Sequence, residues 1–410
     1  MATAVLDLDL VNLPASISGL NTYKEAYILI RYNGHPIGRT YVPLQNGTIE
    51  MNDCYERMLA ATSETRKLTW LKEYLNYDIR NTIDSKPIKV TIAICTRDRT
   101  EDLRRCLDSL INLPDDGQEI IVIDNAPKTS DTKNLVSSYS TVRYVLEQNP
   151  GLNNARNRAL QEAKHEIVAF TDDDAVPEKN WLRAIIKNFN NPLVYCVTGL
   201  VMPLELETEA QEAFERYSPF NKGFWRTIHS NKTRSPLATG QVGAGANMAL
   251  RKDVYEKVGW FDETLDAGTP TCSGGDHEMF TRILAAGYHI VYEPDALSWH
   301  RHRRSWKELC DTIYGYGVGV YSLFTCHLVR RGEFGVFKLA YQWFWLSQSR
   351  ILLKSLLNKP NSHPKELILS ELKGCLRGPF AYFVSRKRVK RSKNIALSAY
   401  GFHQSNHSNT

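Results

Sequence analysis

The chain has 410 residues, of which 42% are hydrophobic and 23% are charged, and its formal net charge is +6 at pH 7. A chain of this length buries a large core, and we expect one catalytic domain with appended pieces rather than one giant domain. Its eight cysteines are scattered without paired spacing, which is typical of reduced thiols and argues against a disulfide-stapled secreted scaffold. The N-terminal residues lack the pattern of a signal peptide, so we expect a cytoplasmic protein.

The first predicted elements form a small module. Residues 26–44 alternate like two strands around the turn Asn33-Gly34-His35-Pro36, which is a hairpin signal. A helical stretch follows at residues 51–75. Together these patterns predict a small N-terminal α+β module over residues 1–85.

From Ile88 onward, predicted strands and helices alternate without a break. The strands are 88–95, 119–124, 142–146 and the stretch from Ile167; the helices between them are 101–112, 131–139 and 152–164. Single helices between strands require right-handed parallel crossovers, so we predict a Rossmann-like α/β layer. Thr100 is expected to cap the first helix. The first strand is followed by neither Gly-x-Gly-x-x-Gly nor a Walker lysine loop, which weighs against a nicotinamide or ATP site.

The strand from Ile167 ends in three consecutive carboxylates, Asp172, Asp173 and Asp174. Open α/β sheets bind their ligands at this edge. Asp172 and Asp174 share one side of an extended chain, and carboxylates suit Mg2+ or Mn2+. The alternative is an acidic turn that caps the helix predicted at 178–189.

Other predicted strand ends also carry polar side chains. They are Thr96, Arg97 and Asp98 after the first strand, Asp124 and Asn125 after the second, and Asn153, Asn154 and Arg156 around the start of the third helix. Together they could bind the base, ribose and pyrophosphate of a nucleotide. Each also has a plainer interpretation: residues 124–127 suit an Asx-type turn, and a lone arginine is commonly only solvated.

A second acidic segment lies further along the chain, at residues 273–280. Gly274 and Gly275 would let the backbone approach a ligand closely, and Asp276 stands at a predicted helix start, where it could also be a simple cap. A strand is predicted at 288–292, with Glu293-Pro294-Asp295 as its turn. His300 and His302 alternate after it, so they would share one side of an extended chain, where a zinc site is conceivable although no third ligand is evident.

Five segments, in this order and spacing, resemble the inverting family 2 glycosyltransferases of bacterial type, which have the GT-A fold. They are TIAICTRDR (91–99), EIIVIDNAP (119–127), GLNNARNRAL (151–160), TDDD (171–174) and GGDHEMFTR (274–282). The resemblance covers residues 86–304. It implies a GT-A nucleotide-sugar-binding domain, a nucleotide-diphospho-sugar donor and a divalent metal, Mn2+ or Mg2+.

The resemblance also implies roles for single residues. Thr96 and Asp124 would contact the base and Arg156 the diphosphate, Asp172 would approach the ribose or the metal, and Asp174 would bind the metal. Arg97, Asp98, Asn125 and Asp173 join the expected donor-binding set, and His300, slightly preferred over His302, would complete the metal site. Asp276 is the expected catalytic base, with Glu278 orienting it or the acceptor. Trp225, Asn247, Gly274 and Gly275 are expected on the acceptor side.

The chain departs from the family pattern in the second acidic segment. Gly275 stands where the family usually has an acid, and Glu278 stands where it usually has an aspartate, whereas the distal arginine is present as Arg282. These departures leave Asp276 as the best candidate for the base.

Residues 305–410 are predicted to form a helical, basic C-terminal extension. Its aromatic residues precede the basic run Arg386-Lys387-Arg388-Val389-Lys390-Arg391, and charged or amide residues interrupt every 18-residue window. Such a pattern suits an anionic membrane surface or a lipid-linked acceptor, so we expect a protein that can lie peripherally on the inner face of a membrane. We expect no nucleic-acid partner. The alternative is an ordinary helical extension that packs on the core.

The sequence therefore predicts an inverting, metal-dependent glycosyltransferase that acts in polysaccharide, glycolipid or other glycoconjugate synthesis. It leaves open whether the donor is UDP-, dTDP- or GDP-linked and whether the acceptor is a sugar or lipid-linked. A non-catalytic nucleotide-sugar-binding protein would lack a productive base such as Asp276. A sugar-nucleotide pyrophosphorylase would carry a glycine-rich nucleotide loop near its first strand, and this chain has none.

Overall fold

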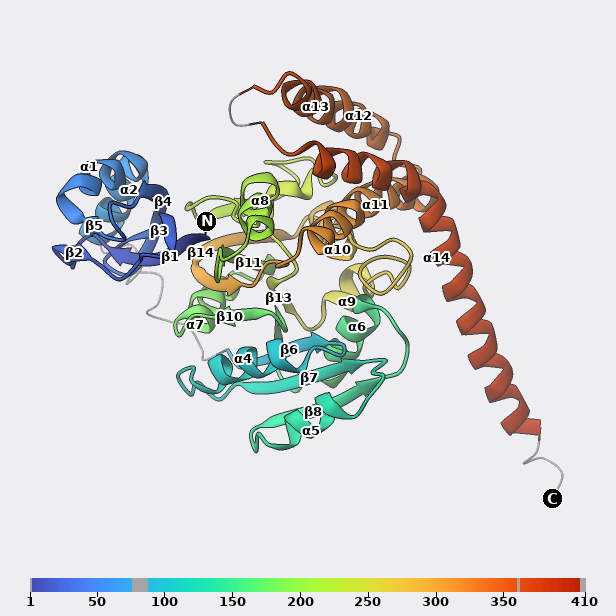
Figure 1. The fold of residues 1–410 in the computed structure, drawn as a ribbon. Helices are drawn as coiled ribbons and strands as arrows, with labels where there is room; N and C mark the ends of the chain where they lie inside the picture. Colours follow the sequence, from blue (N-terminus) through green and yellow to red (C-terminus); the bar gives the residue numbers. More distant parts are fainter. Residues whose placement is uncertain (1, 76–87, 360–361, 406–410) are drawn as a thin grey trace. The chain divides into compact units, whose positions relative to one another are not determined.

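The computed structural model describes residues 2–75, 88–359 and 362–405. They fall into two compact units (Figure 1). Unit 1 comprises Met1–Gln148, Arg156–Trp260 and Met279–Leu309, and unit 2 comprises Asn149–Ala155, Phe261–Glu278 and Cys310–Thr410. The boundary predicted between residues 85 and 86 lies outside the described residues.

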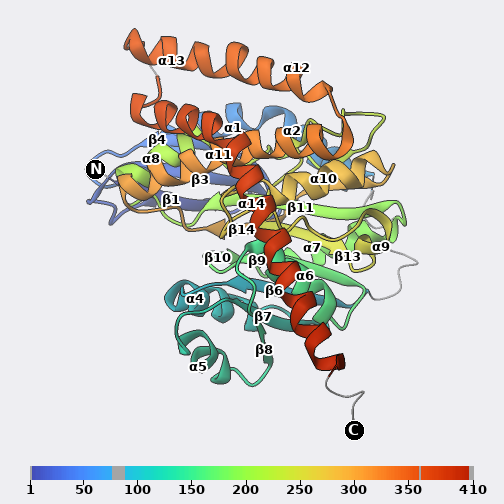
Figure 2. The same ribbon diagram turned by 90° about the vertical axis from the view of Figure 1, so that its right-hand side faces the viewer.

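Unit 1 contains a nine-stranded mixed sheet. Its strands are β6 (Val90–Thr96), β7 (Glu119–Asn125), β8 (Val142–Glu147), β9 (Ile167–Asp172), β10 (Ala175–Pro177), β11 (Val194–Pro203), β12 (Thr227–His229), β13 (Asn247–Arg251) and β14 (His289–His300). The order is β10-β14-β11-β13-β9-β6-β7-β8, with β12 beside β14. β9, β6, β7 and β8 pair in parallel, which confirms the predicted crossovers, whereas β13 is antiparallel to both of its neighbours. Figure 2 shows β6, β7 and β8 side by side at one end of the sheet.

The helices around this sheet follow the predicted alternation. They are α4 (Thr100–Ile111), α5 (Asp131–Ser137), α6 (Leu152–Glu162), α7 (Trp181–Ile186), η1 (Lys187–Asn190), α8 (Glu209–Tyr217), η2 (Thr239–Gln241), α9 (Val254–Val258) and α10 (Gly275–Ala285). The apolar stripe of α4, with Leu103 and Leu107, packs beside Trp181 of α7 and Ile92 of β6 in the main core. Burial of these side chains holds the carboxyl ends of the strands in place.

Three local predictions are corrected. The predicted cap Thr100 is the first residue of α4, and Arg99 precedes it without a side-chain cap bond. The helix predicted at 178–189 is the shorter α7 followed by the 3-10 turn η1. The predicted turn at 293–295 does not end its strand, because β14 continues to His300; instead its pairing with β11 skips from Glu293 to Ser298.

The N-terminal module also belongs to unit 1. It comprises β1 (Ala2–Asp9), β2 (Ser16–Ile17), β3 (Tyr23–Tyr32), β4 (His35–Pro43), β5 (Ile49–Glu50), α1 (Met51–Ala61) and α2 (Ser63–Tyr74), with β3 between β1 and β4. The predicted hairpin is confirmed: Asn33 and Gly34, both at positive φ, join β3 to β4. One face of β3 packs within the module through Ile28, while its other face packs through Leu29 against Leu297 of β14. Both faces of β3 are therefore buried.

Unit 2 is mainly helical. Its C-terminal helices are α11 (Trp306–Arg331, which starts in unit 1), α12 (Gly335–Tyr341), the π-helical turn η3 (Gln342–Gln348), α13 (Ser349–Leu356) and α14 (Lys365–Ser405). A Cβ on Gly317 would lie 2.1 Å from the Glu371 carbonyl oxygen, so this glycine lets α11 and α14 pack closely. Within the part of the chain that the structure describes, no helix is both long and apolar enough to cross a membrane.

Candidate active site

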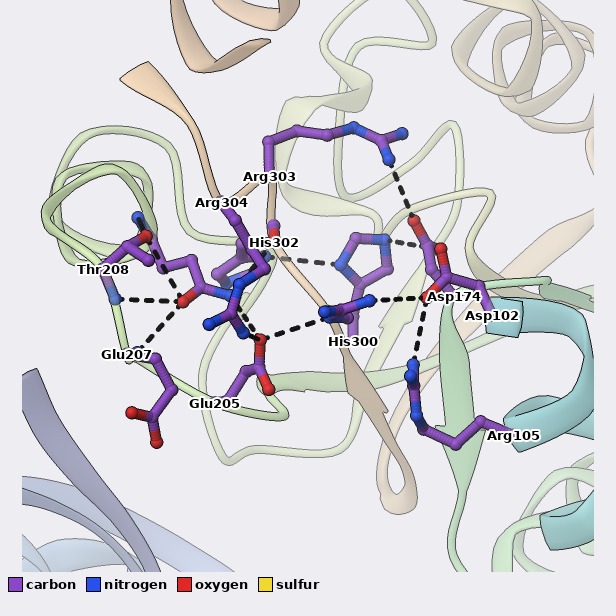
Figure 3. A network of polar contacts seen from close by, with 12 residues as sticks. Asp102, Arg105, Asp174, Glu205, Glu207, Thr208, His300, His302, Arg303 and Arg304 are labelled. Atoms are coloured by element: carbon purple, nitrogen blue, oxygen red, sulfur yellow. Dashed lines mark hydrogen bonds and ion pairs between the residues drawn. The ribbon is translucent and has the colours of Figure 1, made fainter. Parts of the chain in front are cut away.

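Two carboxylates and one histidine gather where β9 ends. Asp172 is the last residue of β9, Asp174 precedes β10, and His300 is the last residue of β14. One ligand atom from each of these three side chains lies within 4.8 Å of the other two. Figure 3 shows the His300 ring facing Asp174. The cluster is the set of side chains that the sequence predicts as a metal site.

The electrostatics of this cluster fit a divalent cation. Asp174 Oδ1 is buried 3.1 Å from His300 Nε2 and, among the described residues, accepts no hydrogen bond of normal geometry. Burial would raise the pKa of Asp174, but His300, Arg99 and Arg303 outweigh it and hold that pKa well below its usual value. Burial and the neighbouring Asp174 raise the pKa of Asp172. Two carboxylates that repel each other and a histidine nitrogen are a suitable donor set for Mn2+ or Mg2+.

The middle carboxylate of the triplet lies on the other side of the chain. Asp173 accepts hydrogen bonds from the Thr96 hydroxyl at 2.7 Å and from Arg99 Nη1 at 2.6 Å. Arg99 Nη2 in turn donates to Asp174 at 2.7 Å. Burial raises the pKa of Asp173 to about 7. Asp173 and Thr96, both expected to contact the donor, therefore hold each other, and their role in donor binding stays a prediction.

Arg99 was not among the predicted site residues. It is paired with two of the three carboxylates, so its positive charge offsets their mutual repulsion. The available signal was its position: it ends the segment TRDR directly after β6 and directly before α4. Arginine at such a strand-to-helix turn faces the same sheet edge as the acidic strand end.

The carboxylate of Asp124 lies at the end of β7 and has one buried oxygen that could accept a hydrogen bond from a ligand. Its Oδ2 accepts from the Tyr144 hydroxyl at 2.9 Å, whereas its Oδ1 is fully buried and finds no hydrogen-bond partner among the residues described. Burial raises the pKa of this carboxyl group. A buried acceptor without a donor is costly, and an N–H of a bound base would satisfy it.

The other predicted donor-binding residues differ in exposure. Arg97 and Asp98 are exposed on the loop after β6, where Asp98 Oδ1 accepts from the Lys128 backbone N–H at 2.9 Å. Asn125 is buried at the end of β7. Arg156 on α6 is buried too, and its charge lowers the pKa of Asp172, which places it within electrostatic range of the metal cluster.

The second acidic segment begins α10 in unit 2. Asp276 is partly exposed, and its Oδ1 accepts from the His277 backbone N–H at 2.8 Å. Glu278 is buried, with an oxygen 3.6 Å from Arg331 Nη2. Asp276 is thus the more accessible of the two acids.

The glycine in this segment has a steric reason. A Cβ on Gly275 would lie 2.2 Å from Asn153 Nδ2 and 2.5 Å from Asp266 Oδ2, so these two side chains would have to move to admit one. Gly274 has a φ of 99°, which also favours glycine. Lack of space at Gly275 is therefore one explanation for the absence of the family's usual acid there.

Known proteins share this arrangement of segments. The family model Glycosyl transferase family 2 matches residues 91–259, which include the strands that carry Thr96, Asp124 and the acidic triplet. Residues 91–259 thus match the sequence pattern of family 2 glycosyltransferases. Its sheet, with the parallel β6, β7, β8 and β9 and the acidic end of β9, is the predicted GT-A architecture.

Relatives of the glycosyltransferase domain come from several organisms. The Pre-mycofactocin glycosyltransferase of Mycobacterium tuberculosis is 27% identical over 232 residues, which are 56% of this chain and 46% of that protein. The O-antigen chain rhamnosyltransferase WbaN of Salmonella anatum is 28% identical over 286 residues, 68% of this chain and 82% of the relative. The chain thus spans less than half of the mycobacterial relative.

A solved structure is also similar. The mannosyltransferase PcManGT from Pyrobaculum calidifontis, in complex with GDP-Man and Mn2+, is 17% identical to this chain, with a TM-score of 0.43. The similarity covers 80% of this chain and 87% of the other.

Two residues expected on the acceptor side of the glycosyltransferase domain have contrasting positions. Trp225 is 42% exposed. Asn247 is fully buried, and its amide bonds to Trp181 Nε1 and to the Leu200 and Ala296 carbonyl oxygens at 2.8–3.0 Å. Three satisfied hydrogen bonds in the core favour a structural role for Asn247.

The distal arginine of the family motif also has a clear position. Arg282 Nη1 donates to the Val258 and Gly259 carbonyl oxygens, and Nη2 donates to that of Trp260. These three bonds tie the end of α9 to α10. Arg282 therefore holds the backbone of the segment that precedes Phe261.

Proposed function

We propose that the protein is an inverting, metal-dependent glycosyltransferase that moves a sugar from a nucleotide-diphospho-sugar donor to a hydroxyl acceptor. The product would be a polysaccharide, a glycolipid or another glycoconjugate. The observation that carries this proposal is the Asp172–Asp174–His300 cluster at the acidic strand end of a family 2 domain. A non-catalytic nucleotide-sugar-binding protein would need the residues that bind the base, but it would not need a cation-binding cluster beside them.

The donor would be held by residues of unit 1. Asp124 Oδ1 would accept an N–H of the base, and Arg156 would pair with the diphosphate. A divalent ion bound by Asp172, Asp174 and His300 would offset the negative charge of the departing nucleoside diphosphate. Arg99 and Arg303 keep the Asp174 carboxyl ionised, which is the form that binds metal.

The acceptor would be activated by Asp276. Inversion needs a carboxylate that takes the proton from the acceptor hydroxyl as its oxygen attacks the anomeric carbon. The partial exposure of Asp276 and the ion pair of Glu278 with Arg331 favour Asp276 for this role. Glu278 would then act through α10, by holding the start of that helix against α11.

The experiment that tests this function is a donor panel. Purified full-length protein would be incubated with UDP-, dTDP- and GDP-sugars, with Mn2+ or with EDTA, and nucleoside diphosphate release would be measured. We expect release from one nucleotide class, only with the metal. The anomeric configuration of the transferred sugar, read by NMR, should be opposite to that of the donor, and a retained configuration would contradict the inverting mechanism.

The names of the relatives suggest where to begin. One is a rhamnosyltransferase of O-antigen synthesis, and the solved mannosyltransferase was crystallised with GDP-Man and Mn2+. Deoxyhexose and hexose donors linked to dTDP or GDP are therefore the first to screen, with lipid-linked sugars as acceptors.

We also propose that the C-terminal extension lies on an anionic membrane. Many of its large apolar side chains are exposed: Phe334, Phe337, Tyr341, Trp345, Leu353, Leu376 and Phe380 are each at least half exposed. Exposed cations accompany them, at Lys338, Arg350 and Lys354 and in the run Arg386–Arg391. Apolar side chains that enter the headgroup region, together with cations that attract anionic lipid, are the two signals of peripheral binding.

Vesicle sedimentation tests this second proposal. The protein should co-sediment with vesicles that contain anionic lipid, and less so at high salt. Neutralising Arg386, Lys387, Arg388, Lys390 and Arg391 should lower the bound fraction, because each cation contributes on the order of 1 kcal/mol. If the intact protein stays in the supernatant at low salt, the exposed apolar side chains pack against a protein instead.

A further inference from the structure

Two histidines lie in line behind the metal cluster. His300 ends β14, His302 lies two residues beyond it, and their Nδ1 atoms are 3.3 Å apart (Figure 3). His302 is 4% exposed, and its ring packs on those of Phe214 and Phe220. His302 is not one of the three clustered metal ligands, so its buried polar ring calls for another explanation.

The other side of the His302 ring meets a carboxylate. Glu215 of α8 places its Oε2 3.3 Å from His302 Nε2. Glu215 is 3% exposed, and a buried carboxylate needs several donors to compensate for lost hydration.

Those donors come from the N-terminal module. The Tyr27 hydroxyl on β3 donates to Glu215 Oε1 at 2.8 Å, and Arg39 Nη1 on β4 donates to the same oxygen. Arg39 also donates to the Tyr27 hydroxyl oxygen. Glu215 is therefore fixed by two side chains that lie some 180 residues before it in the sequence.

The contacts from Glu215 to His302 and from His302 to His300 bear on which ring nitrogens carry protons. A carboxylate at Glu215 can only accept, so His302 donates to it from Nε2, and with a single proton on its ring His302 accepts at Nδ1. His300 then donates from its Nδ1, which leaves the lone pair of its Nε2 on the side of Asp174. A metal-binding histidine needs this arrangement, since one ring nitrogen binds the ion while the other donates to a fixed acceptor.

We propose that Glu215 and His302 are positioning residues for the metal site and that the N-terminal module is their anchor. Tyr27 and Arg39 hold Glu215, Glu215 sets the tautomer of His302, and His302 orients His300 so that Nε2 faces the cation. The inference rests on the proposed function, because it takes Asp172, Asp174 and His300 as metal ligands. It gives the module a part in catalysis beyond packing on the sheet.

A merely structural network would look similar, so the test needs a matched control. Glu212 provides one, because it lies one turn before Glu215 on α8 and is also buried. Its oxygens accept from the Thr3 hydroxyl at 2.6 Å and from Lys24 Nζ at 2.7 Å, both in the same module. Replacing Glu212 therefore removes a comparable contact with the module while leaving the contact between Glu215 and His302 in place.

The experiment measures Mn2+ binding to the full-length chain without donor or acceptor. Free Mn2+ is titrated by EPR for wild type, Glu215→Gln and Glu212→Gln, and pulsed EPR detects the 14N coupling of a histidine ligand. We expect Glu215→Gln to weaken Mn2+ binding by about 10- to 100-fold, the usual effect of removing an outer-shell partner, and to reduce the 14N coupling. Glu212→Gln should keep the wild-type affinity and coupling, with a comparable loss of melting temperature.

Tyr27→Phe extends the test to the module and covers the case in which Glu215→Gln does not fold. It removes one hydroxyl that reaches Glu215, and its control Tyr23→Phe removes a hydroxyl that donates to the exposed Glu207. Weaker Mn2+ binding in Tyr27→Phe alone supports the proposal.

Wild-type Mn2+ affinity and 14N coupling in Glu215→Gln would overturn the proposal, as would equal affinities for the two tyrosine variants. In both cases the metal site itself would stand. If wild-type protein binds Mn2+ without 14N coupling, His300 is not a ligand and the proposed metal site fails together with its positioning residues.

Discussion

The two acidic segments of the chain have different surroundings. At the end of β9, Asp174 faces Arg99, His300 and Arg303, and its pKa is held low despite burial. At the start of α10, Asp276 is partly exposed and accepts from the backbone N–H of its own neighbour. Positive charges therefore surround the buried Asp174, whereas Asp276 is partly open to solvent.

This difference suggests how the two segments would divide the work of the proposed glycosyl transfer. A carboxylate that binds a cation must stay ionised, and surrounding positive charges serve that purpose. A general base must become protonated during the reaction, so strong cationic partners would make it too weak. The predictions below test whether the two segments differ in this way.

The largest expected effect concerns Asp174. Asp174→Asn removes a charged ligand from the cluster, and we expect turnover to fall by roughly 1000-fold, because a divalent ion contributes several kcal/mol to the stabilisation of the transition state. EDTA should have the same effect on wild type, and Mn2+ should reverse it. Steady-state rates with increasing Mn2+ measure this.

Asp173→Asn is the control within the triplet. Asp173 pairs with Thr96 and Arg99 and is not one of the three clustered side chains, so its variant should stay more active and more responsive to Mn2+ than Asp174→Asn. Equal loss in the two variants would mean that the triplet acts through its fold and not through two metal ligands.

The next effect concerns Asp276. Asp276→Asn keeps the shape of the side chain but cannot take up the acceptor proton, so kcat should fall by about 100-fold or more. The donor KM should change little, because the base acts on the acceptor. Glu278→Gln is the matched variant: it should lower the melting temperature by weakening the pair with Arg331, with a smaller loss of kcat. The reverse pattern would assign the base to Glu278.

A smaller effect is expected at the base-binding edge. Asp124→Asn replaces the acceptor Oδ1 or Oδ2 by an amide that can no longer accept two hydrogen bonds from the base and Tyr144. We expect the donor KM to rise by about 10-fold, which corresponds to the loss of one hydrogen bond to a charged group. Isothermal titration calorimetry with the nucleoside diphosphate alone measures the corresponding change in its dissociation constant. Unchanged affinity would place the base elsewhere.

Part of the candidate site at the carboxyl edge of the sheet could be predicted from the alternation of strands and helices in the sequence. Parallel strands with single helices between them predict that Thr96, Asp124 and Asp172 end at one edge, and the two-residue period of a strand predicts that Asp173 faces away from Asp172 and Asp174. The register of β6 with β7 and β9 agrees with the first prediction, since it pairs Thr96 with Asp124 and Cys95 with Asp172. Asp173 and Asp174 lie in the turn after β9, so the period of the strand does not decide where Asp173 faces.

The remainder depends on contacts between residues far apart in sequence. Glu215 meets His302 across 87 residues, and Arg39 meets Glu215 across 176, so neither contact leaves a local pattern. In the sequence, Asn247 is a polar residue among small ones. Only the fold shows that its side chain is buried and forms hydrogen bonds with three partners.

The smallest expected effect concerns stability and tests why the second segment departs from the family. Gly275→Ala would place a methyl group within 2.2 Å of Asn153 Nδ2 and 2.5 Å of Asp266 Oδ2, so these side chains must move. We expect the free energy of unfolding to fall by about 1–3 kcal/mol, the usual effect of overpacking. Gly240→Ala is the control, because a Cβ there would meet no atom within 4 Å. Chemical denaturation of both variants measures the difference. If Gly275→Ala is as stable as Gly240→Ala, lack of space does not explain the missing acid.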